Sequence, residues 1–165
     1  MKALHSKLRH IATFSMDYIL LKYAHFLGIF AVVGGVFAEL FMIKSEMSRR
    51  DLKRIAQVDG IYGFGAILTV AAGLTLWLSD IGKPAEFYQE NGLVHLKLAI
   101  FTLVGLLSIH PTIFLMRNRL SKKRPDGEEI VKVPASIGYV VRIEMGLLLL
   151  MPFLGSSMAM GLKLF

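Results

Sequence analysis

Cysteine is absent from this chain of 165 residues, so it forms no disulfide and offers no thiolate for a zinc site or an iron–sulfur cluster. Acidic residues are also few, because 12 aspartates and glutamates face 19 lysines and arginines, which leaves a net charge of +7. The sequence contains no Walker loop, no Gly-x-Ser-x-Gly elbow, no His-Glu-x-x-His pair and no dinucleotide-binding fingerprint. Nucleotide chemistry and soluble-type hydrolase chemistry therefore have no support.

Long apolar runs dominate the chain instead. Hydrophobic residues make up 55% of it and the mean hydropathy is +0.58, values typical of a membrane protein. A helix needs about twenty residues to cross the hydrocarbon core, and four runs of that length occur, at residues 18–43, 58–78, 94–116 and 137–162. We therefore predict an all-α fold, an integral membrane four-helix bundle that forms a single transmembrane domain over residues 1–165.

Charge in the connections predicts how the helices are oriented. The first connection carries five lysines and arginines and the third carries six, whereas the second carries only Lys83. By the positive-inside rule, the first and third connections are cytoplasmic and both chain termini lie on the outer, periplasmic side. Residues 1–17 are basic and weakly apolar, show no cleavage pattern, and are expected to form a short interfacial helix. The basic loops are expected to contact anionic headgroups of the lipid bilayer, and no nucleic acid.

Two ionisable residues at similar depth in the outer half suggest a cofactor site. His25 lies in the first run and Lys97 in the third, so two helices can bring them together. A neutral imidazole is a good ligand for iron or copper, and a lysine can hold a carboxylate such as a porphyrin propionate. Gly65, Thr69 and Gly73 form a strip of small residues on the second run. That strip fits either close helix packing or contact with a flat macrocycle, and a structural role for His25 also stays open.

Two further histidines are weaker candidates for a second metal ligand. His95 lies two residues before Lys97, so the two side chains point to nearly opposite sides of one helix. His110 lies about four turns further along the same run and precedes Pro111, which favours a kink over a catalytic motif. The second ligand, if there is one, is therefore left open between His95 and His110.

A second polar cluster is expected in the inner half. Three carboxylates occur there, Glu39, Asp59 and Glu144, together with Arg142 and Tyr62. A buried arginine can take a carboxylate with two hydrogen bonds, so we expect an ion-pair network that locks the first, second and fourth spans together. A proton path and a hard-metal site are the alternatives.

Methionines on the last run keep a copper site open. Met145, Met151, Met158 and Met160 lie there, the last two in the stretch SSMAMG. Thioethers are soft ligands that suit copper, but flexible packing is the more common role of methionine on a helix.

Four stretches carry a resemblance to a known family, nearly from end to end. They are KYAHFLGIFAVVGGVFAEL, AQVDGIYGFGAILTVAAGL, FYQENGLVHLKLAIFTLVGLLSIHPTIFLMRNR and VVRIEMGLLLLMPFLGSSMAMG. They resemble the bacterial membrane family known as domain of unknown function 2214, which implies a multi-pass protein of the bacterial inner membrane. More distantly, LKYAHFLGIFAVVGGVF and VHLKLAIFTLVGLLSIH resemble helices of the HemJ protoporphyrinogen IX oxidases, and the wider group includes the CopD-type copper-resistance proteins.

The HemJ resemblance implies a haem b protein. It carries over His25 as the haem-iron ligand and Lys97 as the residue on which activity depends. From the strip of small residues we expect Gly65 and Gly73 to lie beside the cofactor. The expected function is porphyrin oxidation or electron transfer, with a porphyrin or a quinone as the small-molecule partner. A copper-handling transporter and a non-catalytic membrane scaffold are the alternatives. Small-residue pairs, Gly34 with Ala38 and Gly155 with Ala159, also suggest a homodimer.

Overall fold

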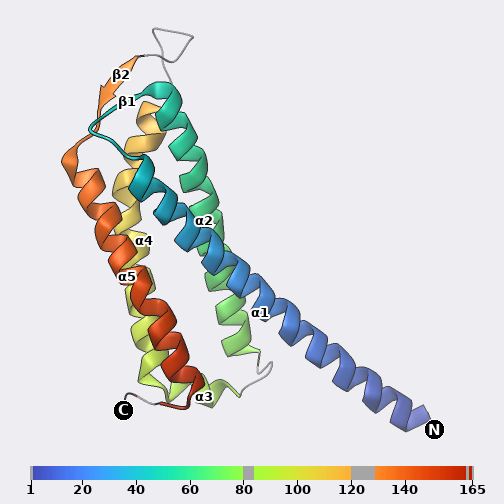
Figure 1. Cartoon of the computed structure of the whole chain (residues 1–165). Helices are drawn as coiled ribbons and strands as arrows, with labels where there is room; N and C mark the ends of the chain where they lie inside the picture. Colours follow the sequence, from blue (N-terminus) through green and yellow to red (C-terminus); the bar gives the residue numbers. More distant parts are fainter. Residues whose placement is uncertain (1, 80–83, 120–128, 163, 165) are drawn as a thin grey trace.

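The computed structural model describes residues 2–79, 84–119, 129–162 and 164, with side chains from residue 16 onward. Four helices within these ranges are long and apolar enough to cross a membrane, which confirms the all-α, four-span fold (Figure 1). The elements are α1 (Lys2–Met42), β1 (Glu46–Ser48), α2 (Arg49–Leu78), α3 (Ala85–Gln89), α4 (Gly92–Asn118), β2 (Ile130–Lys132) and α5 (Ala135–Ala159).

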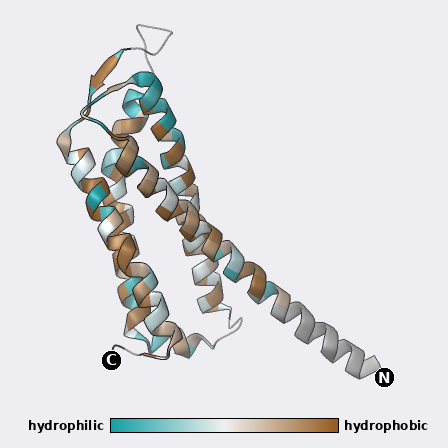
Figure 2. Cartoon of the chain, in the orientation of Figure 1, coloured by the Kyte–Doolittle hydropathy of each residue, from teal (hydrophilic) through white to brown (hydrophobic). Residues whose placement is uncertain are grey.

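The start of α1 and the end of α5 point toward the same end of the molecule, where α3 also lies, and β1 and β2 lie at the opposite end (Figure 1). We call these the α3 end and the β-pair end. Hydrophilic residues gather at the β-pair end, whereas hydrophobic ones predominate along the long helices (Figure 2). The basic connections are those at the β-pair end, so the charge rule predicts that this end is cytoplasmic.

The helix boundaries differ from the prediction at three places. Residues 2–15 continue α1 without a break, so the separate interfacial helix was wrong. The second span begins at Arg49, nine residues earlier than expected, because Ser48 caps it. The Ser48 hydroxyl accepts a hydrogen bond from the amide of Asp51 at 3.1 Å and donates one to the Asp51 carboxylate at 2.7 Å. The last span ends at Ala159 and not at residue 162.

A short antiparallel pair of strands closes the β-pair end and was not expected from the sequence. Met47 of β1 pairs with Val131 of β2. Next to this pair, the Arg49 guanidinium donates to both carboxylate oxygens of Glu129, at 2.8 and 3.1 Å, and to the carbonyl oxygen of Asn118 at 2.9 Å. This forked contact ties the start of α2 to the end of α4 and to the segment before β2.

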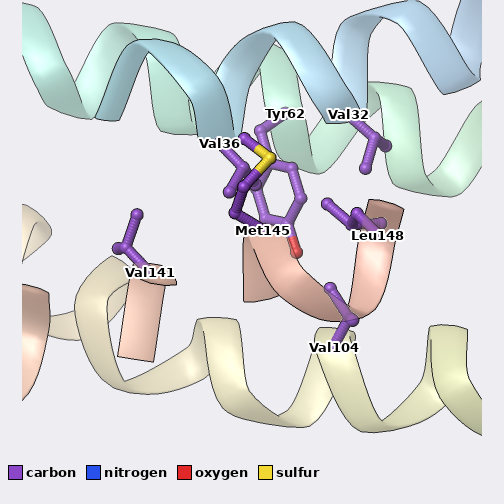
Figure 3. Packing of buried hydrophobic residues seen from close by; sticks show 7 residues of the cluster. All are labelled: Val32, Val36, Tyr62, Val104, Val141, Met145 and Leu148. Carbon is purple, nitrogen blue, oxygen red and sulfur yellow. The ribbon is translucent and has the colours of Figure 1, made fainter. Parts of the chain in front are cut away.

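Two apolar clusters form the core. The larger one lies in the middle of the bundle and takes residues from all four long helices: Val32, Val36, Tyr62, Val104, Val141, Met145 and Leu148 (Figure 3). The smaller one lies toward the β-pair end and comprises Met47, Leu52, Ile55, Ala56 and Leu115. Many large apolar side chains are exposed, among them Phe30, Ile67 and Phe153 at 70% or more, as expected of helices whose outer faces contact lipid.

Glycines allow α1 and α2 to pack very closely. A Cβ added at Gly65 would lie 2.9 Å from the carbonyl oxygen of Gly28 and 3.2 Å from the amide nitrogen of Val32. A Cβ at Gly35 would lie 2.7 Å from the Cβ of Tyr62. The small residues therefore bring the two backbones into contact, as in other membrane helix pairs.

Candidate functional site

His25 of α1 is held in one orientation by the backbone of α2. Its ring nitrogen Nδ1 lies 2.8 Å from the carbonyl oxygen of Thr69. A carbonyl can only accept, so Nδ1 carries the proton and the neutral ring keeps a free electron pair on Nε2. The ring rests on Gly73, where a Cβ would lie 3.2 Å from it. Gly73 therefore contributes to the site by making room for the imidazole.

Lys97 of α4 lies within electrostatic range of His25. Its side chain is half-buried, and its Nζ would stand 3.7 Å from a Cβ placed on Gly155 of α5. No ion pair joins Lys97 to another residue in the described part of the chain. The structure thus places Lys97 within electrostatic range of His25, with Gly73 beside the imidazole and Gly155 beside the ammonium group, so that each long helix supplies one residue.

Gly65 does not belong to this group. Its free face is filled by α1, because an added Cβ would meet Ala31 at 2.6 Å. The prediction that Gly65 contacts a cofactor is therefore wrong, and the helix-packing interpretation applies to it. The strip of small residues therefore has two roles. Gly65 allows α2 to pack on α1, and Gly73 makes room for the imidazole of His25.

The other two histidines make contacts of their own. His110 is exposed, and its Nε2 lies 3.2 Å from the hydroxyl of Ser136. His110 lies thirteen residues from Lys97, or about 20 Å along α4. It therefore cannot bind a metal held by His25 near Lys97, and the prediction of His110 as the second ligand is wrong. His95 is also exposed, with Nδ1 3.3 Å from the carbonyl oxygen of Asn91 and its ring edge-on to Trp77.

The inner acidic cluster forms without its expected cation. Glu39, Asp59, Glu144 and Tyr62 are all buried. Arg142 is exposed, and its guanidinium lies 5.7 Å from the ring centre of Tyr139. The predicted ion-pair network with Arg142 is therefore wrong. The reason is geometric, since Arg142 and Glu144 are two residues apart and a helix points such side chains to different faces.

Some relevant residues gave no sequence signal. The hydroxyl of Thr112 donates to Asp59 at 2.8 Å, and the side chain of Tyr62 lies near Ser108 of α4. The indole nitrogen of Trp77 is buried without an acceptor in the described residues. These contacts join different helices, so they depend on the rotation of each helix about its axis, which no local pattern encodes.

Comparison with known proteins gives one family. The family described as "Predicted membrane protein (DUF2214)" matches residues 18–163. No curated protein and no solved structure matches the chain.

Proposed function

Because the chain belongs to the DUF2214 family of predicted membrane proteins, we propose for it a function inside the bilayer: binding of haem b, with His25 as the axial ligand of the iron. Lys97 faces a propionate carboxylate of the same group. The haem would supply one-electron redox chemistry, either porphyrin oxidation or electron transfer.

The orientation of His25 is the observation that carries this proposal. Metal-binding histidines commonly donate the proton of their second nitrogen to a carbonyl or carboxylate, which fixes the ring and increases the basicity of the ligating nitrogen. His25 does this through Nδ1 and the carbonyl oxygen of Thr69. The free Nε2 is therefore the atom that would bind the iron.

The set of available donors favours a macrocycle over a bare ion. Within the described residues there is no group of three histidine, cysteine, aspartate or glutamate side chains that could hold a metal. A bare copper ion needs several protein ligands. A porphyrin brings four nitrogens of its own and needs only one or two more ligands, which one histidine satisfies.

Lys97 supports an anionic ligand. A cation in the membrane normally has a partner, because an unpaired charge in hydrocarbon costs at least about 2.5 kcal/mol. Lys97 is half-buried and has no acidic partner in the described residues. A propionate would supply that partner, and the flexible side chain of Lys97 would hold it as a point charge.

The test is an absorption spectrum of the protein purified from cells with sufficient haem, oxidised and then reduced with dithionite, with metal analysis of the same sample. We expect a Soret band in the native chain, its loss in His25→Ala, and its retention in the matched controls His95→Ala and His110→Ala. Lys97→Ala should weaken haem retention while His25 still ligates the residual haem.

An unshifted Soret band in His25→Ala would refute the assignment of the ligand. Stoichiometric copper without haem would support the copper-handling alternative, and loss of Met158 or Met160 should then matter more than loss of Lys97. No cofactor at all would leave the scaffold alternative, in which these side chains only stabilise the bundle.

A further inference from the structure

Three carboxyl groups meet inside the bundle on its β-pair side. Glu39 of α1 is 1% exposed, Asp59 of α2 is 5% exposed and Glu144 of α5 is 0% exposed. They are close enough to interact electrostatically, since Glu39 is affected by both of the others and Glu144 by Asp59. Three helices thus bury acidic side chains within electrostatic range of one another.

Two of these three groups have unpartnered oxygens. Oε1 of Glu39 and both carboxylate oxygens of Glu144 are buried and accept no hydrogen bond from the described residues. Of the three, Asp59 alone has a donor among the described residues, the hydroxyl of Thr112. Buried polar atoms in proteins are nearly always hydrogen-bonded, so three orphaned oxygens in one cluster require an explanation.

The groups that face the cluster from the neighbouring helices include no cation. From α2 comes Tyr62, whose hydroxyl points away from α1 and α2 (Figure 3). From α4 come Thr112 and Ser108, neither of which titrates. The nearest arginine in the sequence of α5, Arg142, is exposed. Within the described chain, nothing positive balances the carboxylates.

An unbalanced cluster of this kind cannot stay fully ionised. Burying one unpaired carboxylate in an apolar interior costs several kcal/mol, and repulsion between neighbouring carboxylates adds to that cost. A divalent metal is not the answer, because no three of these side chains are arranged to hold one in the described part of the protein. The smallest cation that removes the charge, and needs only one oxygen, is the proton.

We propose that Glu39, Asp59 and Glu144 form a proton-binding site in the cytoplasmic half of the bundle. Each proton bonds to one carboxylate oxygen, converts it to a neutral carboxylic acid and lowers the negative charge of the site by one. Glu39 and Glu144, whose buried oxygens lack donors among the described residues, carry the bound protons, whereas Asp59 accepts its hydrogen bond from Thr112. The new hydroxyl groups also supply the donors that the cluster lacks.

Infrared difference spectroscopy of the full chain in lipid bilayers tests this site. A protonated carboxyl group has a carbonyl stretching band that an ionised one lacks. At neutral pH we expect such bands, with one component lost in Glu39→Gln and another in Glu144→Gln. Exchange of water for deuterium oxide should shift both components. Glu46→Gln is the matched control, because Glu46 is exposed on β1 and its loss should leave the bands unchanged.

Each other outcome contradicts the proposal in a distinct way. No band sensitive to either glutamine variant would mean that the carboxylates are ionised. A band that appears only after sodium and potassium are removed would assign the site to a metal cation. A band unaffected by deuterium oxide would show a sealed structural acid. The site does not depend on haem, so the same spectra of His25→Ala, with the Soret band recorded in parallel, separate failure of one proposal from failure of the other.

Discussion

Replacing Gly28 by alanine should force α1 and α2 apart. A Cβ at this position would lie 2.8 Å from the carbonyl oxygen of Gly65 and 2.8 Å from the amide nitrogen of Thr69. Ordinary contact begins at 3.4 Å, so the methyl group lacks about 0.6 Å against each of two backbone atoms. A side chain could rotate away, but the backbone of a helix moves only if the whole helix moves.

The net cost follows from two opposing effects. Inserting a methyl group into a well-packed contact costs about 1–3 kcal/mol. Alanine offsets up to about 1 kcal/mol of this through its higher helix propensity than glycine. We therefore expect Gly28→Ala to lower the free energy of unfolding by up to about 2 kcal/mol when the full propensity gain applies. Because Gly28 and His25 share one face of α1, the shift should also stretch the 2.8 Å bond from His25 to Thr69.

Gly34→Ala is the matched control on the same helix. A Cβ there meets no heavy atom within 4 Å in the described structure, so only the gain in helix propensity applies. We would measure helicity by circular dichroism while the fraction of denaturing detergent in mixed micelles increases. Gly34→Ala should unfold at the same or a higher fraction than the native chain, and Gly28→Ala at a lower one. If Gly28→Ala were as stable as Gly34→Ala, the argument from close backbone packing would be refuted.

Two local hydrogen bonds give further predictions. Ser48→Ala removes the N-cap of α2 and should cost about 1 kcal/mol in the same unfolding assay, whereas Ser45→Ala, at an exposed position without a cap, should cost nothing measurable. Thr112→Val leaves a buried oxygen of Asp59 without its donor and should cost about 1–3 kcal/mol. Thr75→Val is its control, because the exposed Thr75 hydroxyl bonds only within its own helix; equal losses in both threonine variants would contradict the role given to Thr112.

The sequence was sufficient to predict the four spans and the proximity in depth of His25 and Lys97. Apolar length determines where a helix crosses the bilayer, and the position of a residue along its helix determines its depth. Both are properties of a single helix, so no knowledge of packing is needed. The early start of α2 could also have been predicted, because Ser48 and Asp51 have the spacing of a capping box. The charged residues of its first turn instead favoured a loop in the prediction.

The remaining features depend on how the helices rotate against one another. Arg142 was predicted to pair with Glu39 because the two lie at similar depth. Arg142 and Glu144 are two residues apart on one helix, so only one of those two can face inward. The pairing of β1 with β2 joins segments more than 80 residues apart, so no local pattern predicts it. Gly65 could have faced a cofactor or a helix, and only the path of α1 decides between them.

A layer of buried, mostly apolar side chains separates the two polar clusters. His25 and Glu39 are fourteen residues apart on α1, about 21 Å along the axis. Val32 and Val36, both at most 1% exposed, occupy the interval together with the rest of the central cluster (Figure 3). The valine side chains offer no hydrogen-bonding group, and among the described residues no chain of side-chain hydrogen bonds joins the two clusters. The clusters can still interact electrostatically. One unit charge at about 20 Å, with an effective dielectric constant of about 20, contributes about 0.8 kcal/mol. A change of charge at His25 would therefore alter the proton-binding constant of Glu39 by only about fourfold. Such a change is enough to modulate the acidic site but not to control it.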